Sequence, residues 1–82
     1  MKYMVELRLK PGVKNKALEA FEQRGPDRTP GVTLRGAWVA DRKELVFALL
    51  ESADEALIAQ AASAWSEYGD SQITSVHDIE QL

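Results

Sequence analysis

The sequence predicts one α+β domain whose elements follow the order strand, helix, strand, strand, helix, strand. Residues 44–51 form a short run that is apolar on both sides, as in a central strand. Two other segments repeat apolar residues at helical spacing, and the remaining segments alternate apolar and polar residues. The chain has 82 residues, which is the size of a single domain covering residues 1–82.

The run at residues 44–51 organises the rest of the chain, because successive side chains of a strand point to opposite faces. One face carries Leu45, Phe47 and Leu49, and the other carries Val46, Ala48 and Leu50. A strand that is apolar on both faces must be covered twice. A chain this short has few residues left for that task. We therefore expect its helices to cover one face and a second copy of the chain to cover the other, and the residues alone leave open which face meets the helices.

The first half of the chain contains a strand and a helix. Residues 3–9 alternate and are followed by Pro11 and Gly12, which is typical of a half-buried strand that ends in a turn. From residue 13 the apolar residues follow helical spacing, in a stripe made of Val13, Ala17, Leu18, Ala20 and Phe21. We expect this helix to end near Gly25, and residues 25–31, which hold two of the three prolines, to form a turn.

Residues 32–39 predict the second strand, with Val32, Leu34, Gly36 and Trp38 on one face. A glycine inside this strand, Gly36, indicates a bulge or the close approach of another backbone. The polar turn at residues 41–43 is short enough to join this strand to residues 44–51 as a hairpin.

The second helix has a start signal and a stop signal. Ser52 and Glu55 have the spacing of a capping box, and Gly69 is expected to be a left-handed stop. The inward stripe is expected to consist of Leu57, Ala61, Ala64, Trp65 and Tyr68, with Ile58 and Ala62 on its flank. Residues 72–78 alternate again and predict the last strand, and we expect residues 79–82 to fray.

This order of elements is the split unit of ferredoxin-like folds. Right-handed crossovers place both helices on one face of a four-stranded antiparallel sheet, with the first and third strands in the centre. The third strand is the doubly apolar run, and its central position allows a layer to cover each of its two faces.

Composition narrows the classes of function. The net charge of −3 argues against nucleic acid and anionic membranes as partners, because both attract basic surfaces. With no cysteine and one histidine, neither a disulfide nor a metal site is expected. No apolar run is long enough to span a membrane, and charges interrupt the first residues, so no signal-peptide core is expected. We expect a cytoplasmic protein that gains stability by forming a homodimer.

A set of residues spread along the chain resembles a known family. They are residues 1–5, Lys10-Pro11-Gly12, Phe21, Pro30-Gly31-Val32, Gly36, Trp38, Phe47-Ala48-Leu49, Glu51, Asp54, Trp65, Val76 and Asp78. This set resembles the domain-of-unknown-function family 3303 over nearly the whole chain. That family is similar to the dimeric α/β-barrel superfamily, whose members pair two ferredoxin-like sheets face to face.

The resemblance implies a dimer with a ligand-sized space, but it implies no particular reaction. The superfamily includes cofactor-free monooxygenases, haem-degrading enzymes, lactone isomerases and ligand sensors, so the fold leaves the chemistry open. This chain departs from the family pattern at two positions. Val39 stands where the family commonly has a histidine, and Ser75 stands where it commonly has a proline, so a function of that histidine would not carry over to this chain.

Six residues are candidates for binding a small hydrophobic ligand: Trp38, Phe47, Tyr68, Arg8, Glu51 and His77. Large aromatic side chains suit the wall of a site for an organic molecule, and we expect Trp38, Phe47 and Tyr68 to line one cavity. Arg8 and Glu51 lie on strands, where a partner sheet would seal them into a polar pocket. Core packing of the tyrosine and surface salt bridges of the charged residues are the simpler explanations.

His77 is the only imidazole in the chain and could act as a general base or bind haem. A position at the surface or in an interface explains it more simply, because the neighbouring carboxylate of Asp78 points to the other face of the strand. The sequence has no nucleophile motif and no acidic cluster spaced for a metal. No catalytic residue and no cofactor is therefore predicted.

Two classes of function are left. The first is a non-catalytic interaction or small-molecule-binding module that forms a homodimer. The alternative is a cofactor-free enzyme, similar to a monooxygenase or an isomerase, that acts on a hydrophobic small molecule in an aromatic cavity. The sequence leaves open whether the protein is an enzyme, and the volume of any cavity discriminates between the two classes.

Overall fold

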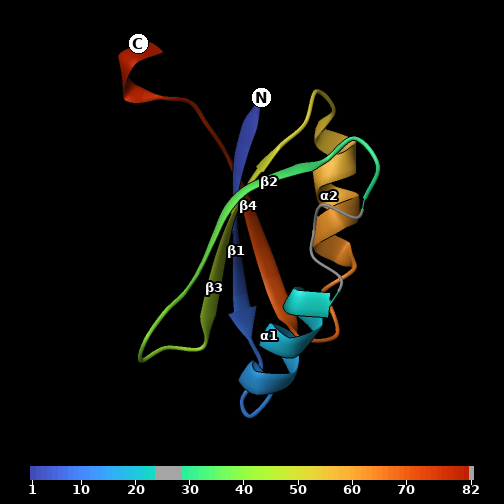
Figure 1. Cartoon of the computed structure of the whole chain (residues 1–82), viewed down its shortest axis with the longest axis vertical. Helices are drawn as coiled ribbons and strands as arrows, with labels where there is room; N and C mark the ends of the chain where they lie inside the picture. The colour runs from blue at the N-terminus through green and yellow to red at the C-terminus, as the bar shows by residue number, and fades with distance from the viewer. Residues whose placement is uncertain (24–28, 82) are drawn as a thin grey trace.

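The computed structural model describes residues 1–23 and 29–81, and it has the predicted order of elements (Figure 1). The elements are β1 (Lys2–Leu9), α1 (Lys14–Gln23), β2 (Thr33–Val39), β3 (Leu45–Glu51), α2 (Glu55–Ser63), β4 (Gly69–Val76) and a 3-10 turn, η2 (Ile79–Gln81). Most of the turn predicted at residues 25–31 lies outside the described residues.

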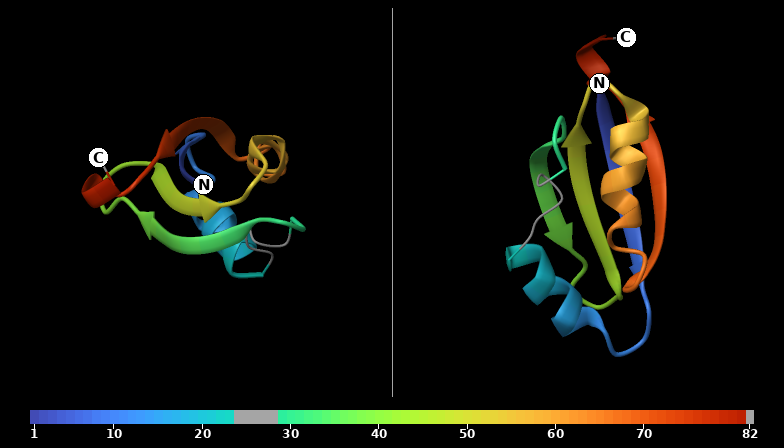
Figure 2. Two further views of the ribbon diagram at one scale, coloured as in Figure 1. Left: turned by 90° about the horizontal axis from the view of Figure 1, so that it is seen from above. Right: turned by 90° about the vertical axis from the view of Figure 1, so that its right-hand side faces the viewer.

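The four strands form one antiparallel sheet in the order β2-β3-β1-β4, so the first and third strands are central, as predicted. Both helices lie on the same side of this sheet (Figures 1 and 2). The other side carries no layer among residues 1–23 and 29–81, and we call it the open face. The structure thus has the predicted ferredoxin-like α+β architecture.

The face of β3 that meets the helices carries Val46, Ala48 and Leu50, which are all buried. The other face of β3 is only half-buried in this single chain. The helices therefore cover the face of β3 that carries Val46, and the face that carries Phe47 is the uncovered one. The core side of β1 adds four buried side chains, Tyr3, Val5, Leu7 and Leu9.

Within the described residues the core forms two apolar clusters that lie under different helices. Ile58, Ala61 and Ala62 of α2 cover the first cluster, around Leu50. The second cluster contains Trp65, Leu7, Leu9, Val46 and the α1 residue Ala17. Because alanines have small side chains, α2 can lie close to the sheet, and the large indole of Trp65 fills the space between the layers.

α2 does not start with the predicted capping box. Its N-cap is Asp54, whose carboxylate accepts a hydrogen bond from the Ala56 N–H at 2.9 Å. Ser52 is buried, and its hydroxyl accepts a hydrogen bond from the Asp54 N–H at 3.1 Å. The prediction was wrong because Ser52 shapes the turn before the cap instead of capping the helix itself.

The predicted inward stripe of α2 is wrong in part. The buried residues are Ile58, Ala61, Ala62 and Trp65, which follow the i, i+3, i+4, i+7 spacing of one helical face. Leu57 is half-buried and Ala64 is exposed. The helix ends at Ser63, so Ala64 and Trp65 lie in the turns that follow it, where Trp65 is buried as predicted and Ala64 is not.

Gly69 begins β4 and is not a left-handed stop, since the positive φ angles among the described glycines occur at Gly12 and Gly31. A Cβ atom at residue 69 would lie 1.9 Å from the carbonyl oxygen of Arg8. Glycine is therefore required here because the backbones of β1 and β4 approach closely. This pairing extends β4 over Gly69–Val76, where the sequence predicted residues 72–78.

β2 contains the bulge that Gly36 indicated. The pairing of β2 with β3 shifts between Leu34 and Gly36, so Arg35 is the extra residue. The predicted common face of this strand is wrong, because the bulge turns Gly36 and Trp38 to the open face while Leu34 stays on the core side. The indole of Trp38 folds over Gly36, where a Cβ atom would lie 2.7 Å from its ring.

We expect Trp65→Ala to lower the free energy of unfolding by about 3–5 kcal/mol, because it removes a buried ring and leaves a cavity. The indole is 7% exposed, and its centroid lies 5.7 Å from the ring centroids of Phe21 and Tyr68. His77→Ala should change this energy by less than about 0.5 kcal/mol, because His77 is exposed. Chemical denaturation checks both variants, and equal midpoints would contradict this description of the core.

Candidate functional site

The open face carries two rows of side chains that cross the sheet from β2 to β4. The strand pairing gives the first row as Trp38, Phe47, Glu6 and Gln72, and the second as Gly36, Leu49, Met4 and Thr74. The β2 and β3 half of each row is apolar, whereas β4 contributes polar side chains. The open face is therefore divided lengthwise into an apolar half and a more polar half.

The apolar half is accessible to solvent in the single chain. Trp38 is 54% exposed, and the β3 side chains next to it, Leu45, Phe47 and Leu49, are half-buried. Met4 of β1 is also half-buried and extends the same surface. We call these five residues, Met4, Trp38, Leu45, Phe47 and Leu49, the apolar strip.

Two ion pairs border the apolar strip at one end of the sheet. Arg35 Nε lies 2.5 Å from Glu51 Oε1, and Lys2 Nζ lies 3.1 Å from Asp78 Oδ1. Lys2 and Glu51 are opposite each other in the pairing of β1 with β3, so the two ion pairs form one charged border. The side chains are between a third and just over half exposed, so each pair contributes little to stability.

The hydrogen bond from Arg35, and secondly its positive charge, lower the pKa of Glu51 below the ordinary value for glutamate. The carboxylate thus stays charged at neutral pH and keeps its pairing with the guanidinium. The opposite end of the open face carries Arg8, which is exposed and lies across from Leu45 and Asp70.

His77 follows β4 and is exposed, at the same end of the sheet as Glu51. Both residues border an open hollow of about 280 Å³, together with Met1, Lys2, Ser75 and Val76. The structure therefore places five of the six predicted site residues, Arg8, Trp38, Phe47, Glu51 and His77, on the open face or at its border.

Tyr68 lies on the other side of the sheet. Its ring packs against Trp65 in the second core cluster, and its carbonyl oxygen accepts a hydrogen bond from the Lys10 N–H at 2.8 Å. The expectation that Trp38, Phe47 and Tyr68 line one cavity was therefore wrong. The helical spacing placed Tyr68 correctly near the core. Gly36 indicated a bulge in β2, but the sequence did not show that this bulge turns Trp38 to the open face.

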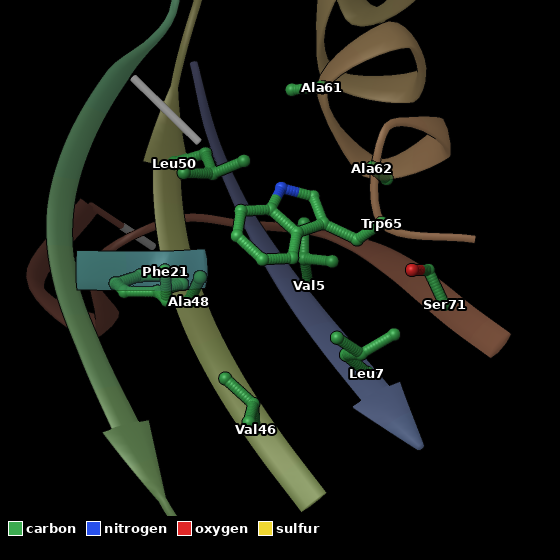
Figure 3. Close-up of a pocket in the computed structure, with 10 residues that line it drawn as sticks. All are labelled: Val5, Leu7, Phe21, Val46, Ala48, Leu50, Ala61, Ala62, Trp65 and Ser71. Carbon is green, nitrogen blue, oxygen red and sulfur yellow. The ribbon is translucent and has the colours of Figure 1, made fainter. Parts of the chain in front are cut away.

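An apolar cavity of about 30 Å³ lies between the helices and the sheet (Figure 3). It is lined by Val5, Leu7, Phe21, Val46, Ala48, Leu50, Ala61, Ala62, Trp65 and Ser71. This volume is enough for one or two water molecules and too small for an organic ligand. Sequence reasoning missed this cavity, because every lining residue except Ser71 follows a pattern that equally predicts a filled core.

The part of the chain that the structure describes offers no group of three or more acidic or histidine side chains that could hold a metal ion. Within the same residues, no helix has the length and apolarity needed to cross a membrane.

Arg35→Ala should raise the pKa of Glu51 towards the ordinary value for glutamate, because it removes the hydrogen bond and the charge that lower it. With its pKa lowered in the fold, Glu51 stabilises the native state above the ordinary pKa. That contribution disappears as the pH falls through the lowered pKa. A carboxyl NMR titration of Glu51 measures the shift. Arg8→Ala, at the other end of the face, is the matched control and should leave the titration unchanged.

Solved structures share this fold. A NIPSNAP domain protein from Burkholderia xenovorans has a TM-score of 0.59 at 15% identity, covering 95% of each chain. A structure described as an antibiotic biosynthesis monooxygenase has a TM-score of 0.66 at 11% identity, covering 95% of this chain and 97% of the other. A NIPSNAP family protein from Agrobacterium tumefaciens has a TM-score of 0.60 at 15% identity, covering 95% and 93%. At these identities the likeness concerns the fold alone.

The search of curated proteins gave no match to this sequence. A family model described as a domain of unknown function, DUF3303, matches residues 1–82. This match confirms the resemblance seen in the residues along the chain, and the structural neighbours agree with it in fold. The chain therefore belongs to the DUF3303 family, and it has a ferredoxin-like fold.

Proposed function

We propose that this chain is a non-catalytic module that functions as a homodimer, in which two copies pair through their open faces. The single observation that carries the proposal is the apolar strip, the residues Met4, Trp38, Leu45, Phe47 and Leu49 on the uncovered side of the sheet. A contiguous apolar surface on a small domain is typical of a surface that a partner covers.

The apolar strip provides the driving force for pairing. Burial of apolar surface is worth about 25 cal/mol per Å², or about 1.5–3 kcal/mol for a large side chain that passes from full exposure to burial. Trp38, at 54% exposed, has the most to gain. Several such side chains acting together are needed to offset the cost of association, about 4–15 kcal/mol.

The polar half of the open face sets a condition on this pairing. Glu6 is half-buried between Phe47 and Gln72 in the pairing of the strands. A partner sheet would remove water from its carboxylate, which is costly unless a positive group is near. Arg8 lies two residues along β1 on the same face, and a homodimer brings two copies of each residue to the interface.

We expect Phe47→Glu to convert the dimer into a monomer at micromolar concentration, because it adds a charge to the centre of the apolar strip. Gln60→Glu is the matched control, since it adds the same charge on an exposed site of α2, away from the open face. Light scattering measures the mass of each variant. Finding the unmodified 9.1 kDa chain as a monomer, or finding Phe47→Glu still dimeric, would refute the proposal.

Binding of a small apolar molecule is a second function, and the arrangement around Phe21 favours it. Phe21 and Val46 border both the cavity of about 30 Å³ and an open groove of about 300 Å³ between α1 and β2. Phe21 is half-buried on the last turn of α1. Because its ring borders both spaces, we infer that a change in its side-chain rotamer joins them into one site of ligand size.

We favour binding over catalysis at this place because Ser71 is the one polar residue that lines the cavity. A cofactor-free oxygenation or isomerisation needs an acid or base within hydrogen-bond reach of its substrate. Among the described residues no acid or base lines the cavity, and the groove is lined by a single one, Glu22, whose side chain is exposed on α1. The monooxygenase among the structural neighbours shares the fold at 11% identity, and this likeness gives no evidence of a shared reaction.

We also propose a cytoplasmic location for this protein. The net charge of −3 and the absence of cysteine fit this proposal.

Native mass spectrometry of freshly purified protein is expected to show twice the chain mass plus the mass of a bound apolar molecule. Phe21→Trp should remove the added mass and keep the dimer, because a larger ring closes the connection between groove and cavity. A bare dimer for the unmodified chain would count against small-molecule binding and leave the dimer proposal intact.

A further inference from the structure

The chain continues past the end of β4 in a segment that leaves the body of the domain. We call residues 77–81 the C-terminal arm; it contains η2 and projects from the side of the sheet opposite the helices (Figures 1 and 2). The ion pair between Lys2 Nζ and Asp78 Oδ1, at 3.1 Å, braces its base. Because Lys2 belongs to the open-face side of β1, this contact holds the arm over the uncovered side.

The C-terminal arm carries an apolar side chain that its own domain does not cover. Ile79 is 82% exposed, the highest value among the large apolar side chains of the described residues. The other exposed large apolar residues are Met1, Trp38 and Val39, at 69%, 54% and 40%. A single exposed isoleucine is unremarkable by itself, but this one lies on a segment that points to where a second copy would lie.

The reach of the C-terminal arm matches the spacing of paired sheets. Two extended residues and three residues of 3-10 helix span roughly 12 Å, at about 3.3 Å and 2.0 Å per residue. Sheets packed face to face lie about 10 Å apart. An arm of this length that projects from one sheet therefore extends to the level of its partner.

The area of the open face also leaves a role for the C-terminal arm. Taken as a flat rectangle, four strands of seven or eight residues cover roughly 500 Å², from a strand spacing of about 4.8 Å and a rise of about 3.3 Å per residue. Stable interfaces bury about 800 Å² on each partner. Side chains make the accessible area of the face larger than this rectangle, and contacts from outside the sheet bring the interface closer to the area of a stable dimer.

We propose that the C-terminal arm of each copy clasps the other copy, and that Ile79 becomes buried against the partner at the border of the paired sheets. This inference rests on the proposed face-to-face homodimer and adds the segment that completes its interface. The occupant of the arm's apolar side is a second copy of this chain. By symmetry, each dimer contains two such contacts, so a change in one residue acts twice.

Sedimentation equilibrium of the full chain tests the clasp. Ile79→Ser should raise the dimer dissociation constant by about tenfold or more, because both arms lose a buried side chain. Glu80→Ser is the matched control on the neighbouring arm residue, which is exposed, and it should stay within about twofold. Ending the chain at Val76 should weaken the dimer at least as much as Ile79→Ser does.

A second measurement locates the side chain of Ile79 in the dimer. In a dimer mixed from isotope-labelled and unlabelled copies, isotope-filtered NMR should show contacts from the Ile79 methyl groups to the other copy. If the unmodified chain is monomeric, the homodimer and the clasp both fail. If it is dimeric but Ile79→Ser and the truncation leave its dissociation constant unchanged, or the intermolecular contacts are missing, the clasp alone is overturned.

Discussion

The structure depends on the strand β3, which carries large apolar side chains on both faces. Its core side, Val46, Ala48 and Leu50, is buried by the helices, while Leu45, Phe47 and Leu49 on the other side remain half-buried. The helices can cover only one of these faces, because both lie on the same side of the sheet. The central position of β3, the packing of α2 and the character of the open face all follow from this.

Close packing on the core side comes from a combination of very small and very large residues. Ala61 and Ala62 bring α2 near the sheet, and Gly69 lets β4 approach β1 at a point where no side chain fits. Trp65 then occupies most of the space that remains, and a cavity of only about 30 Å³ is left. The interior is thus packed for stability, and the accessible apolar side chains lie on the open face and along the groove between α1 and β2.

Periodicity predicted the order of elements and the central strands, because strand and helix repeats differ strongly and both were long enough to recognise. The ends of elements were less predictable. Ser52 matches the pattern for a helix cap, but the neighbouring Asp54 caps the helix instead. Gly69 matches the pattern for a helix stop, but it is required by the close approach of β4 to β1. The candidate site failed in part for a similar reason: whether Trp38 and Tyr68 share a face depends on a bulge that depends on the pairing of β2 with β3.

The bulge at Arg35 allows the one segment at residues 32–39 to contribute side chains to both the core and the open face. Residues before it, Val32 and Leu34, contribute to the core, whereas Gly36 and Trp38 after it contribute to the open face. The alternation of inward and outward side chains therefore shifts by one residue within the strand. An insertion or deletion of one residue near this point would exchange the inward and outward sets of the second half of β2, with Val39 and Ala37 moving outward and the indole inward. Related chains should accordingly tolerate substitutions in this strand far better than changes in its length.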